Sequence, residues 1–474
     1  MLQLSMAKIA VRIAGASLLF TAAFGLHCSG ETILAGDAQD GREDAAPPDA
    51  PVDPPGDDAE GLPCPDDCED LNPCTGDVCV GGSCVHTPVP DGTACDPGVL
   101  CPAGGVCEGG LCSPLPRPEE GSILWTRPLE PPEHGTAVLH EPGGDLIVLS
   151  SARAERLRQD GSVVWSVPAY LSGNLGQLES LIVGDVVVTA QYDEMVGLDL
   201  GTGGEIWRSE AGGYIDSTVL GIDGLLIVSS VNLMSGPFML RAYVPESGAE
   251  VWGFEVDVRV GEMAARADGF IYASNGGQSD SPGYVLGLLP DGSELFRTEI
   301  QNWGRPWISV DYSGAAVLTY PFVRIGPEGE ILTPIGEYMS QMEAVISPDG
   351  SIVIVGDNAD AVLRWLGRDG EVRAEHPIGD NSLNHPLVDA CGIVYFLTYH
   401  GTITAVGPGG KLRWSAPVGS PEIVESVPDL SDDGVLFVAT YDTLYAIQAA
   451  GAPLADTSWP RFRADPQATA TALR

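Results

Sequence analysis

Positive charge is scarce in this sequence. Lysine and arginine together number 23, against 66 aspartate and glutamate residues, and the formal net charge is −43. Phosphate backbones and anionic lipid headgroups are held by basic surfaces, so this balance argues against nucleic acid and acidic membranes as partners. Common catalytic motifs are also missing: there is no serine-nucleophile elbow, phosphate-binding loop or His-Glu-x-x-His helix. The best-known hydrolase, nucleotide-binding and zinc-protease mechanisms therefore have no support.

Residues 1–28 have the features of an export signal. Basic residues precede an apolar run at 13–24, which is too short to span a membrane comfortably. Cys28 follows this run and resembles the cysteine of a bacterial lipoprotein signal, which is lipidated after cleavage. The resemblance implies a lipid anchor at Cys28, and Ser29 after it implies sorting to the outer membrane. The residues before the cysteine depart from the usual box, so a soluble secreted protein cleaved after Gly25 is the alternative.

Residues 29–63 form an acidic linker that is rich in proline and alanine. They contain almost no large apolar side chain, so they are expected to remain an extended, disordered tether. The next segment, 64–115, holds nine of the 11 cysteines and has few apolar residues. Disulfides must hold such a segment together, which points to an oxidising compartment. This module resembles the short Cys-rich repeats that precede domains in exported bacterial lipoproteins.

The cysteines of the module fall into two similar groups of four. We expect the first to pair with the third and the second with the fourth in each group, although four cysteines allow two other connectivities. Cys64 is left over, and zinc is disfavoured because the spacings lack the two-residue separation of zinc knuckles. The expected disulfide cysteines are Cys68, Cys74, Cys79, Cys84, Cys95, Cys101, Cys107 and Cys112.

A glycine followed four residues later by a large apolar residue, usually tryptophan, recurs through the rest of the chain. Gly203-Gly-Glu-Ile-Trp207 is one copy of this phrase. The copies are 37 to 45 residues apart, and each interval has room for four short strands, as in a β-propeller. Nine marking glycines delimit eight repeats. The tryptophans are expected to pack between blades. The marking glycines are Gly121, Gly161, Gly203, Gly248, Gly292, Gly329, Gly370, Gly410 and Gly451.

The predicted fold is all-β. It is an eight-bladed β-propeller of four-stranded antiparallel blades over residues 119–465, preceded by the small disulfide-rich module. The first copy of the phrase, 121–128, comes before any complete blade. We expect it to supply the outer strand of the eighth blade, whose other strands come from about 423–448. Pairing the two ends in this way closes the ring and removes exposed sheet edges.

Three phrases resemble the pyrroloquinoline-quinone type of β-propeller, over residues 121–465. They are Leu198-Asp-Leu-Gly-Thr-Gly-Gly-Glu-Ile-Trp207, Leu444-Tyr-Ala-Ile447 and Ser458-Trp-Pro-Arg-Phe-Arg-Ala-Asp465. In quinone-dependent dehydrogenases of this family, a disulfide between adjacent cysteines stacks on the cofactor and a calcium ion lies beside it. The propeller region here contains only Cys391, which we interpret as a small buried hydrophobe, and it is shorter than those catalytic subunits. The resemblance therefore implies the fold without the enzyme.

The axial mouth of the ring is the usual ligand site of a propeller. Loops that enter the innermost strands should place polar and aromatic side chains there, although such mouths are polar and hydrated in any case. The candidate ligand residues are Glu262, Arg305, Trp307, Glu343, Asn384 and His385. One loop is a candidate calcium site, although its residue types also form ordinary turns; its oxygen-bearing residues are Asp357, Asn358 and Asp360.

The predicted function is that of a non-catalytic, membrane-anchored extracytoplasmic scaffold. Its partner would be a protein or a glycan at the axial face or the rim, with no cofactor other than, at most, calcium. The lipid anchor, linker and ring also resemble the outer-membrane-protein assembly lipoproteins, whereas the Cys-rich module does not. A quinone-dependent dehydrogenase-like enzyme is the alternative, and stabilisation by quinone plus calcium would distinguish it from the scaffold.

Overall fold

The computed structural model describes residues 68–472 with short gaps. The gaps are residues 69, 71, 81–82, 96–104, 115–116, 130–135, 151–152, 169–178, 233–236, 276–281, 301–306, 334–339, 341, 357–360, 380–384, 399, 420–425, 441 and 466. The export signal and linker predicted from the sequence lie outside the described residues, as do Cys28, Cys64 and Cys101. In the described ranges the only helix is a short 3-10 turn, η1 (Pro408–Gly410), and no helix has the length and apolarity needed to cross a bilayer.

The disulfide-rich module consists of two small antiparallel sheets. A two-stranded hairpin is followed by a three-stranded sheet in the order β3-β4-β5. Its core consists of the buried side chains of Cys74, Cys95 and Cys107, with Val89 and Cys112 packed against them. Sulfur therefore fills the place that aliphatic side chains take in larger domains. The strands are β1 (Thr75–Val80), β2 (Ser83–Pro88), β3 (Ala94–Cys95), β4 (Gly105–Glu108) and β5 (Leu111–Pro114).

The disulfides confirm a cross-linked module, but the predicted pairing of first with third and second with fourth is wrong. In each group the first cysteine pairs with the fourth, and one further disulfide joins the two groups across 33 residues. Cys79 is also disulfide-bonded. Spacing within a group could not identify a bond between groups, because that bond depends on how the two sheets pack. The pairs are Cys68–Cys84, Cys74–Cys107 and Cys95–Cys112.

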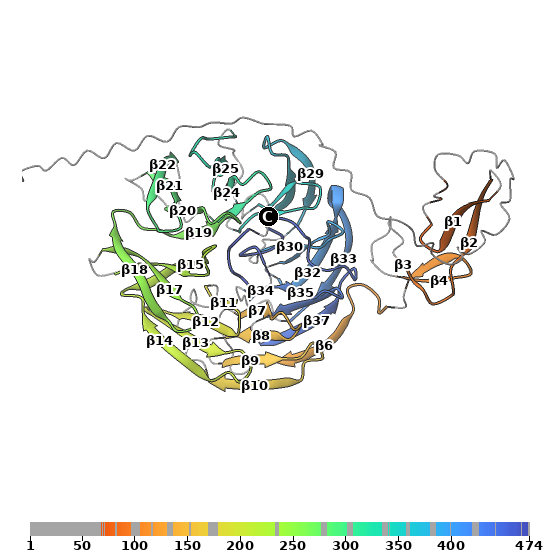
Figure 1. Cartoon of the computed structure of the whole chain (residues 1–474), viewed down its shortest axis with the longest axis horizontal. Coiled ribbons are helices and arrows are strands. Elements are labelled where there is room, and N and C mark those ends of the chain that lie inside the picture. Colours follow the sequence, from red (N-terminus) through yellow and green to blue (C-terminus); the bar gives the residue numbers. More distant parts are fainter. Residues whose placement is uncertain are drawn as a thin grey trace, which may run out of the picture. The chain divides into compact units, whose positions relative to one another are not determined.

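Successive antiparallel sheets are arranged as a ring, which confirms the predicted eight-bladed β-propeller (Figure 1). The second strand of each blade is a continuous buried run because neighbouring blades cover both of its faces. Blade 1 contains β7 (Thr136–His140), β8 (Leu146–Leu149), β9 (Arg153–Leu157) and β10 (Val163–Pro168); blade 2 contains β11 (Leu181–Val183), β12 (Val186–Gln191), β13 (Glu194–Asp199) and β14 (Glu205–Glu210); blade 3 contains β15 (Tyr214–Leu220), β16 (Leu226–Val231), β17 (Phe238–Val244) and β18 (Ala249–Val256); blade 4 contains β19 (Glu262–Ala265), β20 (Ile271–Asn275), β21 (Gly283–Leu288) and β22 (Glu294–Ile300).

The second half of the ring is less regular. Blade 5 has three strands among the described residues, and only a single bridge, Ile325 to Ile331, marks the place of the fourth. Blade 5 contains β23 (Ile308–Val310), β24 (Ala316–Thr319) and β25 (Phe322–Ile325); blade 6 contains β26 (Val345–Ile346), β27 (Ile352–Val355), β28 (Val362–Leu366) and β29 (Val372–Pro377); blade 7 contains β30 (Leu387–Val388), β31 (Val394–Leu397), β32 (Thr402–Gly407) and β33 (Lys411–Pro417); blade 8 contains β35 (Asp429–Leu430), β36 (Val435–Ala439), β37 (Thr443–Gln448) and β6 (Ile123–Pro128), with β34 (Ser426–Val427) joining it to β7.

The ring closes as the sequence predicts. Strand β6, from the beginning of the propeller, pairs with β37 near its end, with Trp125 opposite Ala446. On the inner side, β34 pairs in parallel with β7 of blade 1. Blade 8 therefore joins both ends of the propeller sequence, so each blade has a neighbour on both sides.

The recurring tryptophans pack between blades, which confirms the role predicted for them. The indole Nε1 of Trp165 donates to the Leu200 carbonyl at 2.9 Å, and Trp207 does the same to Pro245 at 2.7 Å. Each ring also covers the marking glycine of the next blade: a Cβ on Gly203 would lie 2.6 Å from Trp165 Cε3, and its φ is +73°. Glycine is required there both by the positive φ and by the close approach of the indole.

Replacing Trp207 by phenylalanine should lower the free energy of unfolding by about 1–2 kcal/mol, through loss of the Nε1 bond and of part of the ring. The propeller should stay folded, because blade 4 already carries Phe296 at this position. Urea unfolding followed by tryptophan fluorescence and circular dichroism measures the change. An unchanged midpoint would mean that the indole bond contributes nothing to the seam.

Candidate functional site

The centre of the ring is occupied by the end of the chain. Residues 453–472, here called the axial segment, run along the innermost strands and lie inside the ring of blades (Figure 1). Backbone amides of five blades donate to carbonyls of this segment, at 2.7–2.9 Å; the donors are Ile182, Leu220, Ala265, Ile346 and Val388. Gln467 Nε2 donates to the His140 carbonyl of blade 1 at 2.9 Å, and the side-chain contacts described below reach blades 5 and 8, so the segment contacts all eight blades.

The path of the axial segment is imposed by the ring. Four of its non-glycine residues have left-handed backbone conformations, with φ between 56° and 68°. Each such residue costs of order 1 kcal/mol relative to the ordinary helical or extended regions. Local preference would not select this path, so the surrounding contacts must hold it. The four residues are Arg463, Ala464, Ala468 and Ala470.

Two arginines of the axial segment are buried in ion pairs. Arg461 Nη1 lies 2.8 Å from Asp429 Oδ1 of blade 8, and both side chains have no exposed surface. Arg463 Nη1 lies 2.6 Å from Glu179 Oε2 at the start of blade 2, and both side chains are 3% exposed. Arg463 also donates to the Thr218 carbonyl and side chain in blade 3. Arginine suits such sites because its planar guanidinium offers several donors in fixed directions.

An aromatic cluster lies beside these arginines. The ring of Phe462 lies 4.0 Å from that of His385 and 5.5 Å from that of Trp307, measured between centroids. His385 Nδ1 accepts a hydrogen bond from the Glu343 backbone N–H at 3.0 Å, so this nitrogen carries no proton. Glu343 Oε2 in turn accepts from the Arg463 backbone N–H at 2.9 Å. Burial raises the pKa of Glu343 to about 8, against hydrogen bonds from Arg463 and Trp459 that lower it.

The structure brings together three of the six predicted ligand residues. Trp307, Glu343 and His385 all face the axial segment, through contacts with one another, Phe462 or Arg463. Glu262, at the start of β19, is also buried, with 5% exposure. Arg305 and Asn384 lie outside the described residues, as do the calcium candidates Asp357, Asn358 and Asp360. A ligand at the axial site would therefore have to share it with the axial segment or displace the segment.

Sequence reasoning missed the residues that organise this centre. Arg461, Arg463, Asp429 and Glu179 were not assigned a role, although the phrase 458–465 carries two of them. A signal was available: two arginines beside Trp459 and Phe462, after the last complete strand, in a chain that is poor in basic residues. Such a cluster at the end of a repeat array indicates a segment that docks rather than a free tail.

Two groups of side chains approach metal-ligand spacing in the described part of the chain. The sulfurs of Cys74, Cys95 and Cys107 are engaged in disulfides. Asp70, Asp77 and His86 lie together on the module surface, where the Asp77 carboxylate accepts from His86 at 2.8 Å. This bond raises the pKa of His86, and the Asp70 backbone and His86 lower the pKa of Asp77. Asp77 and His86 therefore already act as each other's electrostatic partners.

Cys391, in blade 7, is disulfide-bonded. The interpretation of this residue as an isolated buried hydrophobe is therefore wrong. Its position as the sole cysteine after residue 112 gave no indication of a disulfide.

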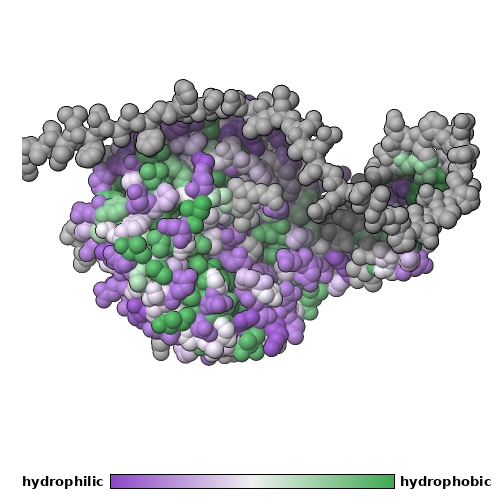
Figure 2. All heavy atoms as spheres, in the orientation of Figure 1, coloured by the Kyte–Doolittle hydropathy of each residue, from purple (hydrophilic) through white to green (hydrophobic). Residues whose placement is uncertain are grey.

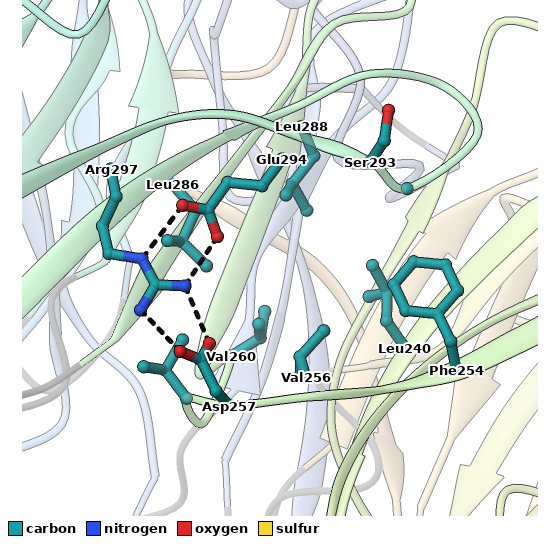
Figure 3. A pocket seen from close by; sticks show the side chains of 12 residues that line it. Leu240, Phe254, Val256, Asp257, Val260, Leu286, Leu288, Ser293, Glu294 and Arg297 are labelled. Carbon is teal, nitrogen blue, oxygen red and sulfur yellow. Dashed lines mark hydrogen bonds and ion pairs between the residues drawn. The ribbon is translucent and has the colours of Figure 1, made fainter. Parts of the chain in front are cut away.

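A narrow apolar groove opens at the rim between blades 3 and 4, and is here called the rim groove (Figure 3). Its volume is about 100 Å³, and its walls include Leu240, Phe254, Val256, Val260, Leu286 and Leu288. Figure 3 shows Arg297 at its mouth, with the guanidinium between two carboxylates. Arg297 Nη2 lies 2.6 Å from Glu294 Oε2 and 2.7 Å from Asp257 Oδ1. These bonds raise the pKa of Arg297 and lower that of Asp257.

The rim groove arises where the seam between blades changes chemistry. In blades 2, 4 and 6, the residue six positions after the marking glycine has a polar side chain. This side chain donates a hydrogen bond to the backbone carbonyl of the marking glycine in the following blade. The donors are Ser209, Thr298 and His376. Blade 3 has Phe254 at this position, whose ring instead covers Gly292 and stacks on Trp252 at 5.3 Å. Two residues on, Ala211 and Ile300 are at most 1% exposed, whereas Ile378 of blade 6 and Val256 are half-buried, and Val256 lies in the groove wall.

The fold defines the chain as an eight-bladed β-propeller. It is similar to BamB from Moraxella catarrhalis, with a TM-score of 0.51 and 16% identity over 69% of this chain and 97% of BamB. It is also similar to a europium-containing methanol dehydrogenase, with a TM-score of 0.52 and 12% identity over 67% of this chain and 84% of that protein. A third similar structure is the quinohemoprotein alcohol dehydrogenase of Comamonas testosteroni, with a TM-score of 0.53 and 13% identity over 71% of this chain and 78% of that protein. No protein-family profile and no curated protein sequence matches the chain. At these identities the similarity establishes the fold.

Proposed function

We propose that this chain is a non-catalytic scaffold that binds a partner protein on the outside of its propeller. The observation that carries the proposal is the axial segment. It places buried arginine, tryptophan and phenylalanine side chains where an axial ligand of an open ring would lie. The outer surface remains for recognition, and apolar and polar patches alternate on the face that Figure 2 shows.

We propose further that Cys28 carries a lipid and anchors the scaffold to the outer membrane, with the acidic linker as a tether. The export pattern and the cross-linked module support an oxidising, extracytoplasmic location. Globomycin should block processing, and Cys28→Ala should release the protein from the membrane fraction. If neither treatment changes its fractionation, the protein is not a lipoprotein.

The enzyme alternative is tested on the purified full chain. Pyrroloquinoline quinone with calcium should leave the melting temperature unchanged and support no dye-linked oxidation of alcohols. Stabilisation together with turnover would overturn the scaffold. Carbodiimide coupling on intact cells, which joins the many carboxylates of this chain to amines of a partner, should instead yield a defined protein adduct, which mass spectrometry identifies. A panel of immobilised glycans separates a glycan partner from a protein partner.

A further inference from the structure

We propose that the rim groove binds a segment of a partner protein that presents one aliphatic side chain next to a lysine or arginine. This inference rests on the proposed scaffold function and specifies its surface. The groove is independent of the axial centre, because its walls come from the outer parts of blades 3 and 4.

The size and lining of the groove select an aliphatic side chain. About 100 Å³ is less than the roughly 300–1,000 Å³ of a cofactor or drug-sized site. Apolar cavities of roughly this size stay dry and accept small apolar groups. The walls of the groove carry Phe254, Val256 and Leu286, and the polar groups are confined to its mouth. A sugar ring would bring hydroxyl groups that this lining cannot satisfy, so a hydrocarbon side chain is favoured.

The mouth of the groove selects a cation. The Arg297 guanidinium already donates to Glu294 and Asp257, so it holds both carboxylates in place. Those carboxylate side chains remain 39% and 73% exposed and have further lone pairs to offer. Two carboxylates against one guanidinium leave a net negative mouth, and Glu255, Asp291 and Glu299 are exposed nearby in sequence. A chain with a net charge of −43 strengthens the attraction of a basic partner.

Selection from a random heptapeptide library displayed on phage, against the purified full chain, tests the proposal. Selected peptides should share Leu, Ile, Val or Met beside Lys or Arg. Val256→Glu should weaken a selected synthetic peptide roughly tenfold or more, since burial of the aliphatic group is lost. The double variant Asp257→Asn, Glu294→Gln keeps the walls intact and should weaken binding about fivefold, with a flatter salt dependence.

Ile206→Glu is the matched control. Ile206 is 47% exposed on β14 and does not line the groove, so this variant adds the same charge elsewhere and should leave affinity unchanged. Affinity that is unchanged or raised to the same extent in Val256→Glu and Ile206→Glu would show non-specific attraction of basic peptides and overturn the proposal. A selected peptide whose aliphatic residue can be replaced by serine without loss would overturn it as well.

Failure of the groove and failure of the scaffold give different results. Binding of the glycan panel that is lost in Val256→Glu would replace the peptide by a glycan and refute this inference. Unchanged cell-surface cross-linking in Val256→Glu would leave the scaffold intact and move its docking surface elsewhere. Quinone-dependent turnover, by contrast, would remove the scaffold function itself.

Discussion

Replacing Arg463 by methionine is expected to lower the free energy of unfolding by about 3–5 kcal/mol. The guanidinium lies 2.6 Å from the Glu179 carboxylate, and both side chains are 3% exposed. Methionine keeps much of the volume but leaves the Glu179 charge buried opposite an apolar group. The cost is chiefly that of an uncompensated buried charge, which exceeds the net contribution of the intact pair.

Urea unfolding of the full chain measures this change, and two further variants establish its origin. Arg208→Met removes an arginine that is 41% exposed and paired with Glu194, so it should cost less than about 1 kcal/mol. Glu179→Gln combined with Arg463→Met removes both charges and should recover part of the loss. If Arg463→Met shifts the midpoint no more than Arg208→Met does, the axial segment does not hold the ring together.

The same unfolding experiment tests whether the axial segment links all the blades into one cooperative unit. Because the segment contacts every blade, its loosening should reduce the cooperativity of unfolding as well as the midpoint. Blades would then open separately, in the way that repeat arrays lose cooperativity when interfaces weaken. A broadened transition in Arg463→Met, with an unchanged width in Arg208→Met, is therefore the expected form of the data.

The blades could be predicted from the sequence because their determinants are local and repeated. Each marking glycine sits in a tight turn with positive φ, and each aromatic four residues later covers the next turn. The turn is set within one repeat and the aromatic contact joins neighbouring repeats, so together they leave a regular mark every 37 to 45 residues. Ring closure by β6 could also be predicted, because the first copy of the phrase, at Gly121, precedes any complete blade. Blade 5 deviates where the phrase at Gly329 lacks an aromatic residue.

The centre of the ring could not be predicted from the sequence, because its contacts are neither local nor periodic. Arg463 and Glu179 are separated by 284 residues, and the bond between them depends on closure of the whole ring. The left-handed alanines of the axial segment carry no sequence mark, since alanine has no preference for that conformation. The bond between Cys74 and Cys107 was missed for a similar reason: it joins two groups that each looked self-contained.

The rim groove is a further feature that could not be predicted from the repeat pattern. A propeller repeat predicts that every seam is filled, and it gives no reason to single out one seam. In the seam between blades 3 and 4, Phe254 stands where blades 2, 4 and 6 carry a hydrogen-bonding side chain, and it lines the rim groove.

The pH dependence of stability provides the last strong test of the axial centre. Burial raises the pKa of Glu343 from 4.5 to about 8, so the folded state favours the protonated carboxyl. The stability that this group confers is fully present below about pH 4.5 and is lost as the pH rises through about 8. Glu343→Gln keeps an acceptor for the Arg463 N–H and removes the titration. The variant and the wild type should be similarly stable at pH 5, and the variant should be more stable at pH 8, by on the order of 3 kcal/mol.

The groups around Glu343 decide how this comparison is made. Arg463, Trp459 and Glu179 act on its carboxyl, and His385 contacts its backbone, so all four must be kept in both proteins. Burial also raises the pKa of Asp465, which contributes a slope of the same sign to the wild type and the variant alike. The difference between urea midpoints at each pH therefore isolates Glu343, and Glu255→Gln, at an exposed position on β18, serves as the control. A difference that stays constant from pH 5 to 8 would show that Glu343 does not titrate in this range, and would place water rather than the axial segment around it.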